Sequence, residues 1–361
     1  MTVSRGTDPA MRPRLRELDF LRCLAMLGVL TIHVTSTFLD GESRVRLMGM
    51  NLAFLLNQVA RFAVPTFVFL SGWSLGLAGQ PASWKAFWKK KVRRFLPPFL
   101  LWSLLYAFTE ANYDPAAFLR LFRDGWWCVR VFLLGQAAPH LYYIPLLFQF
   151  YLLAPLLLRW VRKSPGWALG CAFCSTLLLT GWYILETLGL LALPYPPYLW
   201  MSAPLWLFYF VLGLWLARRP IRPLRTALSR TPVLPALLTA AFALLYCLVS
   251  VRLGVLDSLR LSLLLYTPLV SWAGAALWQR LDRRPLARSA VDFLAPLSMD
   301  IYFSHVLALV WLRRVPLLQK GTWAMLLLWL CTFLSALALS FGLGMLKRLV
   351  SRHKRHRAAS L

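Results

Sequence analysis

The chain is poor in acidic residues and in charge of any kind. It has 13 Asp and Glu against 40 Lys and Arg, a formal net charge of +27, and only 15% charged residues in 361. A soluble globular protein carries about 25% charged residues, so the composition argues against an ordinary soluble domain. Glu110 and Glu186 lie near the ends of apolar stretches. This scarcity of acids argues against a carboxylate-driven proton pump.

Several motifs typical of particular catalytic or cofactor-binding sites are also missing. The sequence has no nucleotide-binding loop, zinc motif, Gly-x-Ser-x-Gly elbow or paired carboxylates. Cys171 and Cys174 have C-x-x-C spacing, but no second Cys or His pair lies nearby. We interpret these and the other four cysteines as small packing residues. We therefore expect no metal and no redox site.

What the sequence does contain is long apolar stretches. Hydrophobic residues make up 59% of the chain, the mean hydropathy is +0.61, and a span needs about 20 such residues. The pattern predicts an all-α polytopic membrane protein with about ten transmembrane helices and both termini cytoplasmic. The expected spans are 18–38, 61–79, 97–112, 140–158, 166–191, 199–217, 232–251, 259–279, 291–312 and 322–346. An amphipathic stretch, 47–60, is expected to lie in the membrane interface.

The positive charges collect in the short links between these spans. This is the positive-inside pattern, so we expect anionic lipids as partners and no nucleic acid. The expected organisation is a basic cytoplasmic amino terminus (1–17), a membrane domain (18–346) and a basic cytoplasmic tail (347–361).

The first span carries an arginine and a histidine that a membrane helix should avoid. Arg22 and His33 are eleven residues apart, which leaves them about 20° apart on one helix face and about 16 Å apart along the axis. An ionised residue at mid-membrane costs roughly 2.5–3.5 kcal/mol. Arg22 therefore either snorkels at the cytoplasmic edge, held by Asp19, or has a function. His33 either makes an ordinary interhelical hydrogen bond or has a function.

Two further polar clusters interrupt the apolar pattern. The basic run at 89–94 contains Lys90, Lys91, Arg93 and Arg94; it either contacts lipid headgroups or clamps the phosphates of a cytosolic anionic cofactor. A second cluster, in the ninth span, consists of three residues at positions i, i+4 and i+7, a spacing that places them on one helix face. These residues are Ser298, Tyr302 and His305. For His305, an interhelical hydrogen bond is the alternative to a function.

Six motifs in order carry a resemblance to a known family. They are R-x(10)-H from Arg22 to His33, VPTFVFLSGW at 64–73, KKVRRFLPP at 90–98, HLYY followed by FQFYLLAP at 140–155, FYFVLG at 208–213 and SMDIYFSH at 298–305. Together they resemble the membrane-bound acyltransferase family type 3, integral-membrane O-acyltransferases that modify surface polysaccharides. The resemblance covers about 17–346. It implies a ten-helix domain in the bacterial plasma (inner) membrane.

The resemblance also implies substrates and residue roles. The donor would be acetyl-CoA or another acyl-CoA, and the acceptor a hydroxyl of a surface or lipid-linked glycan. Arg22 and His33 match the required pair. The R-x-x-R motif of the family maps to Lys90–Arg93 or to Lys91–Arg94, with Lys in place of the first Arg. Lys keeps the charge but lacks the bidentate fork of Arg.

These roles lead to a hypothesis for the mechanism. His33 accepts the proton of the attacking hydroxyl or positions the thioester, and Arg22 with the four basic residues of 90–94 binds coenzyme A. Ser298, Tyr302, His305 and Tyr143 are candidates for binding the acceptor or supporting the site. Two other classes stay open: a polysaccharide exporter or flippase without acyl transfer, and a membrane domain that senses a ligand without turnover.

Overall fold

The structure is a computed structural model dominated by helices. It describes residues 15–39, 46–47, 50–219, 238–239, 241–242, 245 and 261–359, and for 46–47, 50 and 346–359 the backbone alone. The long helices are α1 (Arg16–Ser36), α3 (Ala63–Ala78), α4 (Trp84–Glu110), α7 (Tyr143–Lys163), α8 (Pro165–Thr187), α9 (Ala203–Leu216), α12 (Leu263–Leu281), α13 (Pro285–Leu312) and α14 (Thr322–Ala359).

Short elements join the long helices. They are a two-residue hairpin, β1 (Arg46–Leu47) with β2 (Met50–Asn51), then α2 (Leu52–Val59), α5 (Pro115–Leu121), α6 (Gly125–Cys128) and a π turn (Val129–Leu133). Single 3₁₀ turns lie at Ala60–Phe62, Leu199–Met201 and Pro316–Leu318.

Seven helical segments in the described part of the chain are long and apolar enough to cross a membrane. They are Arg16–Ser36, Leu52–Ala78, Tyr143–Lys163, Pro165–Thr187, Leu199–Leu216, Pro285–Leu312 and Thr322–Met345. The chain is therefore a multi-pass membrane protein. The predicted span 232–251 falls almost entirely outside the described residues, and the total of ten and the orientation of the termini stay predictions.

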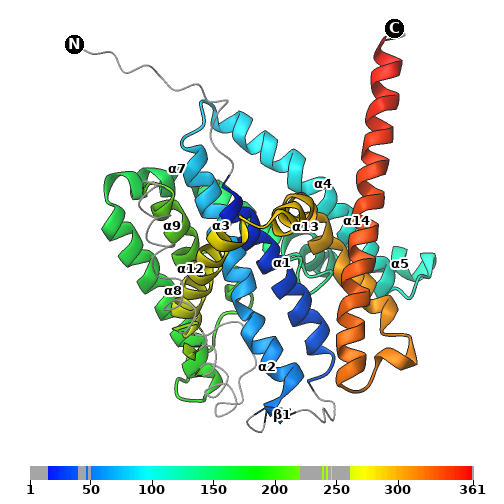
Figure 1. Cartoon of the computed structure of the whole chain (residues 1–361), viewed down its shortest axis with the longest axis horizontal. Coiled ribbons are helices and arrows are strands. Elements are labelled where there is room, and N and C mark those ends of the chain that lie inside the picture. The colour runs from blue at the N-terminus through cyan, green and yellow to red at the C-terminus, as the bar shows by residue number, and fades with distance from the viewer. Residues whose placement is uncertain are drawn as a thin grey trace.

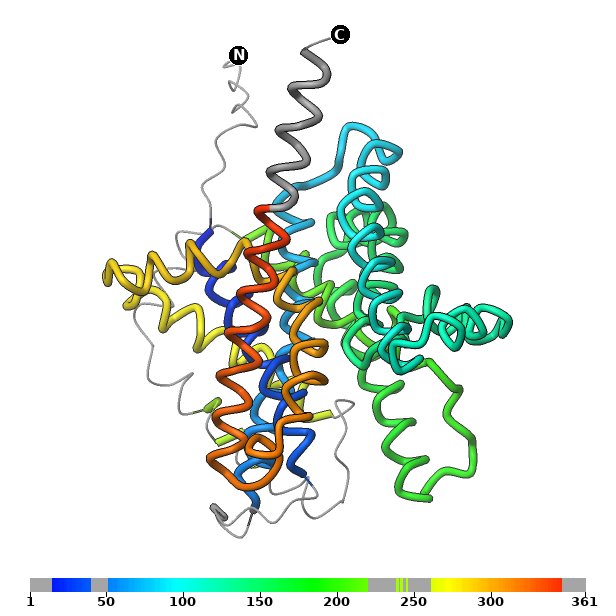
Figure 2. Tube along the Cα trace, turned by 90° about the vertical axis from the view of Figure 1, so that its right-hand side faces the viewer, coloured from blue at the N-terminus to red at the C-terminus, as the bar shows by residue number. Residues whose placement is uncertain are grey.

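Helix α1 lies in the middle of the bundle (Figure 1). It contacts α2, α3, α12, α13 and α14, and Figure 2 shows α1, α13 and α14 running side by side. Its apolar side chains, such as Leu21, Ala25 and Val29, are buried. At Gly28 an added Cβ would lie 2.9 Å from the Cβ of Ala63. Small residues of this kind let membrane helices approach closely, and the approach places the polar face of α1 in the protein interior.

Helix α2, in the stretch expected in the membrane interface, packs against the end of α1. Asn57 and Gln58 of α2 are fully buried, and α2 continues through a 3₁₀ turn into α3. The amide of Asn57 donates to the carbonyl of Ile32 and to the hydroxyls of Thr35 and Ser36, each at 3.0 Å. These polar groups therefore satisfy the carboxyl-terminal turn of α1, and the interfacial position of 47–60 stays a prediction.

The basic run predicted to link two spans belongs to the same helix as the span that follows. Helix α4 begins at Trp84, where the side chain of Ser83 accepts from the backbone N–H of Ala86, and continues through Pro97 and Pro98. Residues of 89–94 therefore have fixed directions around the helix, which decides which of them face the protein.

Candidate active site

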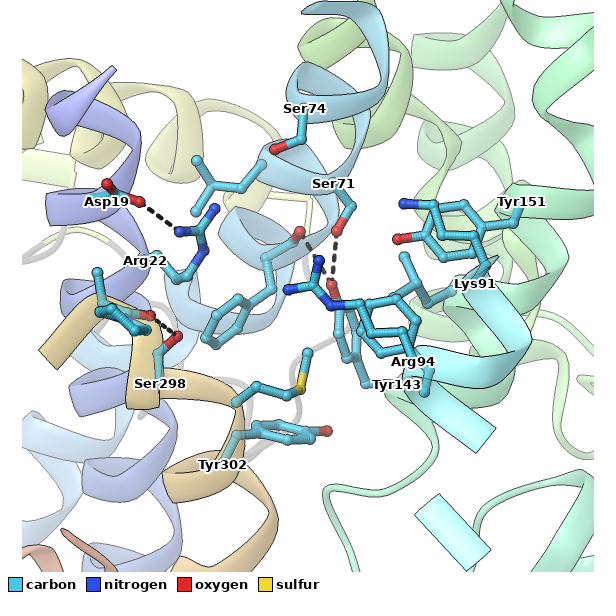
Figure 3. A pocket seen from close by; sticks show the side chains of 17 residues that line it. Asp19, Arg22, Ser71, Ser74, Lys91, Arg94, Tyr143, Tyr151, Ser298 and Tyr302 are labelled. Carbon is cyan, nitrogen blue, oxygen red and sulfur yellow. Dashed lines mark hydrogen bonds and ion pairs between the residues drawn. The ribbon is translucent and has the colours of Figure 1, made fainter. Parts of the chain in front are cut away.

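One cavity brings together six of the residues predicted from the sequence. It has a volume of about 340 Å³ and is lined by side chains of α1, α3, α4, α7 and α13, at the lower end of the usual range for ligand pockets, about 300–1,000 Å³. Figure 3 shows Arg22 on one side and Lys91 with Arg94 on the other. We call it the basic cavity. The predicted residues in its wall are Arg22, Lys91, Arg94, Tyr143, Ser298 and Tyr302.

Arg22 is held in place by Asp19. This ion pair is part of one of the two alternatives that the sequence left open for Arg22. Its Nη1 lies 2.6 Å from Oδ1 of Asp19, one helical turn away, and its side chain is a third exposed. A guanidinium has five N–H donors in a fixed plane, so this ion pair orients Arg22 without using all of its donors. Arg22 faces the cavity rather than only the membrane edge.

The basic run divides into two faces. Lys91 and Arg94, three residues apart, line the basic cavity, as helix neighbours at this spacing do. Lys90 and Arg93 line a separate open groove together with Lys89 and Arg94. Of the two registers that the sequence allowed for the R-x-x-R motif, Lys91–Arg94 faces the cavity.

Lys91 is partly withdrawn from water. Its Nζ lies 4.2 Å from the ring centroid of Tyr151 and 5.3 Å from that of Phe87, at cation–π distance. Burial, and then the charges of Arg94 and Lys90, lower the pKa of Lys91 to about 8. In the part of the chain that the structure describes, no acidic side chain acts on Lys91 to raise its pKa, so its charge is available to an anion.

An aromatic layer closes the deep end of the basic cavity. The rings of Phe67, Tyr143 and Tyr302 lie 5.9–6.1 Å apart, centroid to centroid. Tyr143 is fixed by a 2.9 Å hydrogen bond with the hydroxyl of Ser71 and by donating to the carbonyl of Phe67 at 3.2 Å. All three rings belong to the cavity wall, and His33 does not. The catalytic histidine expected from the sequence therefore lies behind this layer.

Behind the layer, three histidines form an imidazole cluster. His33, His140 and His305 have ring centroids 4.8–5.8 Å apart, and one nitrogen of each lies within 4.8 Å of the others. The ring of Tyr302 lies 5.1 Å from that of His140, and its hydroxyl donates to the His140 carbonyl. Tyr302 thus belongs to the aromatic layer and also supports the cluster.

The predicted face of α13 extends across both regions. Ser298 and Tyr302 line the basic cavity, while His305 points into the imidazole cluster. Ser298 donates to the carbonyl of Ala295 within its own helix. His305 Nδ1 lies 2.7 Å from the carbonyl oxygen of Tyr302 and 3.2 Å from that of Ile301. The bonds seen for His305 are thus within α13, not the interhelical bond that was the alternative.

His140 was not among the residues that sequence reasoning selected. It lies just before α7, is 3% exposed and contacts both other histidines. Two signals were present: it is the first residue of the motif at 140–155, and of five histidines in the chain only His33, His140 and His305 lie outside the basic tail.

Sequence reasoning also missed a polar pair, Asn57 on α2 and Arg61 on the 3₁₀ turn that follows. Nε and Nη2 of Arg61 donate to Oδ1 of Asn57 at 3.0 and 2.7 Å, and the charge of Arg61 acts on His33. A polar pair four residues apart in an apolar stretch was the available signal. Imidazoles are also common transition-metal ligands, and the expectation of no metal stays a prediction.

Comparison with known proteins adds an independent line of evidence. A family described as "Acyltransferase domain" matches residues 15–345. A Bacillus subtilis (strain 168) protein named "Putative membrane-bound acyltransferase YfiQ" is 24% identical over 335 residues, which are 88% of this chain and 89% of that protein. No solved structure matches. The family match covers nearly the whole membrane domain, including the basic cavity, the aromatic layer and the imidazole cluster, so the chain belongs to this acyltransferase family and is a membrane-embedded acyltransferase.

Proposed function

We propose that this enzyme moves an acyl group, acetyl in the first instance, from cytosolic acyl-CoA to a hydroxyl of a cell-surface or lipid-linked polysaccharide. The enzyme would reside in a bacterial plasma membrane with anionic lipids against its basic links. The observation that carries the proposal is the basic cavity, in which Arg22, Lys91 and Arg94 converge directly in front of three histidines.

The charges of the basic cavity suit the donor. Coenzyme A carries phosphates, and Arg and Lys are the side chains that bind phosphate most strongly. The open groove of Lys89, Lys90 and Arg93 adjoins the cavity through Arg94, which lines both. A nucleotide bound over the groove would direct its pantetheine arm into the cavity. The arm is long enough for the separation of about 16 Å between Arg22 and His33 along α1.

The aromatic layer and the imidazole cluster suit the transfer step. The acceptor oxygen attacks the thioester carbon, the C–S bond breaks, and the hydroxyl proton passes to an imidazole, which returns it to the departing thiolate. His33 either accepts that proton or positions the thioester. Tyr302, Tyr143, Ser298 and His305 support the acceptor. A dry aromatic layer between cavity and cluster limits hydrolysis of the thioester.

Family membership favours this reaction over the exporter or flippase that the sequence left open. A transporter would line its path with the same polar groups, but it would not consume a thioester, and the matching family is described as an acyltransferase domain. The same argument disfavours a sensor without turnover.

The test combines a purified enzyme with an analysis of the cell surface. Full-length protein in nanodiscs is supplied with radiolabelled acetyl-CoA and with membranes that contain the natural glycans. We expect release of free CoA and label in the glycan fraction, and mass spectrometry should show an acyl mass difference between glycans of cells with and without the protein. Glycan export without consumption of acyl-CoA would contradict the proposal.

A further inference from the structure

The imidazole cluster contains ring nitrogens without a partner in the described part of the chain. Among these residues, no group makes a hydrogen bond to either nitrogen of His140 or to Nε2 of His305, although the two residues are only 3% and 1% exposed. Leaving a buried polar group unpaired costs about 1–3 kcal/mol. Native structures avoid this cost unless the groups await a ligand or a water molecule. The unpaired nitrogens of two histidines at the same spot therefore indicate a binding site.

The hydrogen bonds of His305 determine which of its nitrogens can accept a proton. Its Nδ1 faces two backbone carbonyl oxygens, those of Ile301 and Tyr302. Carbonyl oxygens only accept hydrogen bonds, so Nδ1 is the protonated nitrogen of the neutral ring. Nε2 then carries a free lone pair, on a ring whose centroid lies 4.8 Å from that of His140 and 5.2 Å from that of His33. A backbone carbonyl on Nδ1 thus fixes the tautomer and ring orientation that a general base requires.

His140 and His33 differ from His305 in ways that fit other tasks. His140 is held through its backbone, because the hydroxyl of Tyr302 donates to its carbonyl oxygen. Its neutral ring therefore offers one donor nitrogen and one acceptor nitrogen to a ligand. His33 is less buried than the other two and shares the face of α1 that also presents Arg22 to the basic cavity. The rings of His140 and His305 lie 5.1 and 6.1 Å from that of Tyr302 in the cavity wall, and the helix face that His33 shares with Arg22 is what links His33 to the donor.

We propose that His140 and His305 hold the acceptor hydroxyl between them, and that His305 rather than His33 is its general base. This rests on the acyl transfer proposed above. The hydroxyl donates its proton toward Nε2 of His305 and accepts from the N–H of His140, which leaves one oxygen lone pair for attack. An oxygen about 2.8 Å from both nitrogens with tetrahedral angles separates them by about 4.6 Å, a spacing that two imidazoles with centroids 4.8 Å apart can present.

The transfer step balances with these three residues. The acceptor oxygen forms a bond to the thioester carbon as its proton moves to Nε2 of His305, and an N–H of His33 donates to the carbonyl oxygen as negative charge develops there. When the C–S bond breaks, the imidazolium of His305 returns the proton to the thiolate of coenzyme A. His140 is a binding residue for the acceptor and takes no proton.

The charge around the cluster favours a neutral oxygen ligand over a metal ion. In the described part of the chain, no carboxylate joins the three imidazoles, and the positive charge of Arg61 acts on His33. A divalent cation at this depth would therefore lack a compensating charge.

The first experiment observes the site directly. A cryo-EM map of the full chain in nanodiscs, with the acceptor absent, is expected to show one ordered water 2.6–3.2 Å from a nitrogen of His140 and from Nε2 of His305, the usual range for such hydrogen bonds. Elemental analysis is expected to find no bound metal. A stoichiometric metal with contacts of about 2.0–2.1 Å, or a well-defined site with no density, would overturn the proposal.

The second experiment separates the roles of the histidines. Acyl transfer from radiolabelled acetyl-CoA is measured against pH for His305→Gln and His33→Gln, with His356→Gln in the basic tail as control. We expect a loss of about 10²–10⁴-fold in His305→Gln and no remaining rise of the residual rate with pH, while His33→Gln keeps that rise. His140→Phe should lose transfer yet bind acetyl-CoA within twofold of the wild type. The reverse pattern for His305 and His33, or full transfer in His140→Phe, would contradict the assignment.

The same measurements distinguish the two levels of the hypothesis. If the wild type neither binds nor consumes acetyl-CoA, the proposed function fails. If it does both, and the pH dependence follows His33, then only the assignment of the base to His305 fails.

Discussion

The basic cavity and the imidazole cluster meet at the aromatic layer, yet they differ in almost every physical property. The cavity is open and cationic: the Arg22 side chain is a third exposed. The cluster consists of imidazole rings with little access to water, and His305 is 1% exposed. Charge attracts and holds an anionic donor where water is present, whereas acyl transfer from a thioester benefits from water being excluded, because water would hydrolyse the thioester. In the function proposed above, the protein would separate donor recognition from chemistry across a layer one ring thick.

The largest effect should come from the cluster. His33→Ala is expected to lower acyl transfer by about 10²–10⁴-fold, the usual contribution of a positioned acid, base or hydrogen-bond donor, while acetyl-CoA still binds. The measurement is label transfer and donor affinity in nanodiscs, with His356→Ala as the matched control. Full transfer by His33→Ala would exclude His33 from the mechanism, and full transfer by His305→Gln as well would end the distinction between the two regions.

A change in the cavity should alter donor affinity instead. Arg94→Ala removes a cation that lines both the cavity and the groove, and charge-assisted hydrogen bonds contribute about 1.5–3 kcal/mol. We therefore expect the KM for acetyl-CoA to rise about 10- to 150-fold with a smaller change in kcat. Steady-state kinetics in nanodiscs measures both constants.

The control for Arg94 is its neighbour on the other helix face. Arg93 lines the groove but not the cavity, so Arg93→Ala should raise the KM less than about fivefold, as expected for an exposed charge worth under about 1 kcal/mol. Equal effects of the two substitutions would show that the cavity has no special role in donor binding.

Tyr302→Phe tests the boundary between the regions. The ring stays in the aromatic layer, but the hydrogen bond from its hydroxyl to the His140 carbonyl is lost. A neutral hydrogen bond contributes about 0.5–1.5 kcal/mol, so kcat should fall about 2- to 10-fold with the KM for acetyl-CoA unchanged. Tyr143→Phe, which loses its bonds to Ser71 and the Phe67 carbonyl, is the comparison within the same layer. A rise in donor KM for Tyr302→Phe alone would place this hydroxyl in the donor site.

Much of this arrangement could be predicted from local spacing. Helix periodicity alone placed Arg22 and His33 on one face of α1, and Ser298, Tyr302 and His305 on one face of α13. Such reasoning works because a helix fixes the directions of residues three, four and seven apart. It also identified the basic run as a candidate donor site, although two registers of that run were equally consistent with the sequence.

The remainder depended on contacts between distant segments. His140 lies in the segment between the π turn and α7, and no periodicity relates it to His33 or His305; only packing of α1, α7 and α13 brings the rings together. The register of Lys91 and Arg94 follows from the direction in which α4 packs against α7 and α13. Burial of Asn57 likewise depends on where α1 ends. Each of these is a tertiary property that local propensity does not encode.

The smallest expected effect concerns the pH dependence of donor binding. Because the pKa of Lys91 is lowered from 10.5 to about 8, its ammonium is charged at pH 7 and becomes neutral as the pH rises through 8. An anionic donor binds the charged form better, so acetyl-CoA affinity should weaken about two- to fivefold between pH 7 and 9, which corresponds to under about 1 kcal/mol for one partly exposed charge. Lys91→Arg keeps its charge over this range and should bind equally at both pH values. Binding isotherms at the two pH values measure the difference, because they exclude the histidine chemistry that dominates the rate. If the wild type and Lys91→Arg weakened alike, Lys91 would not contact the donor and the cavity would depend on Arg22 and Arg94.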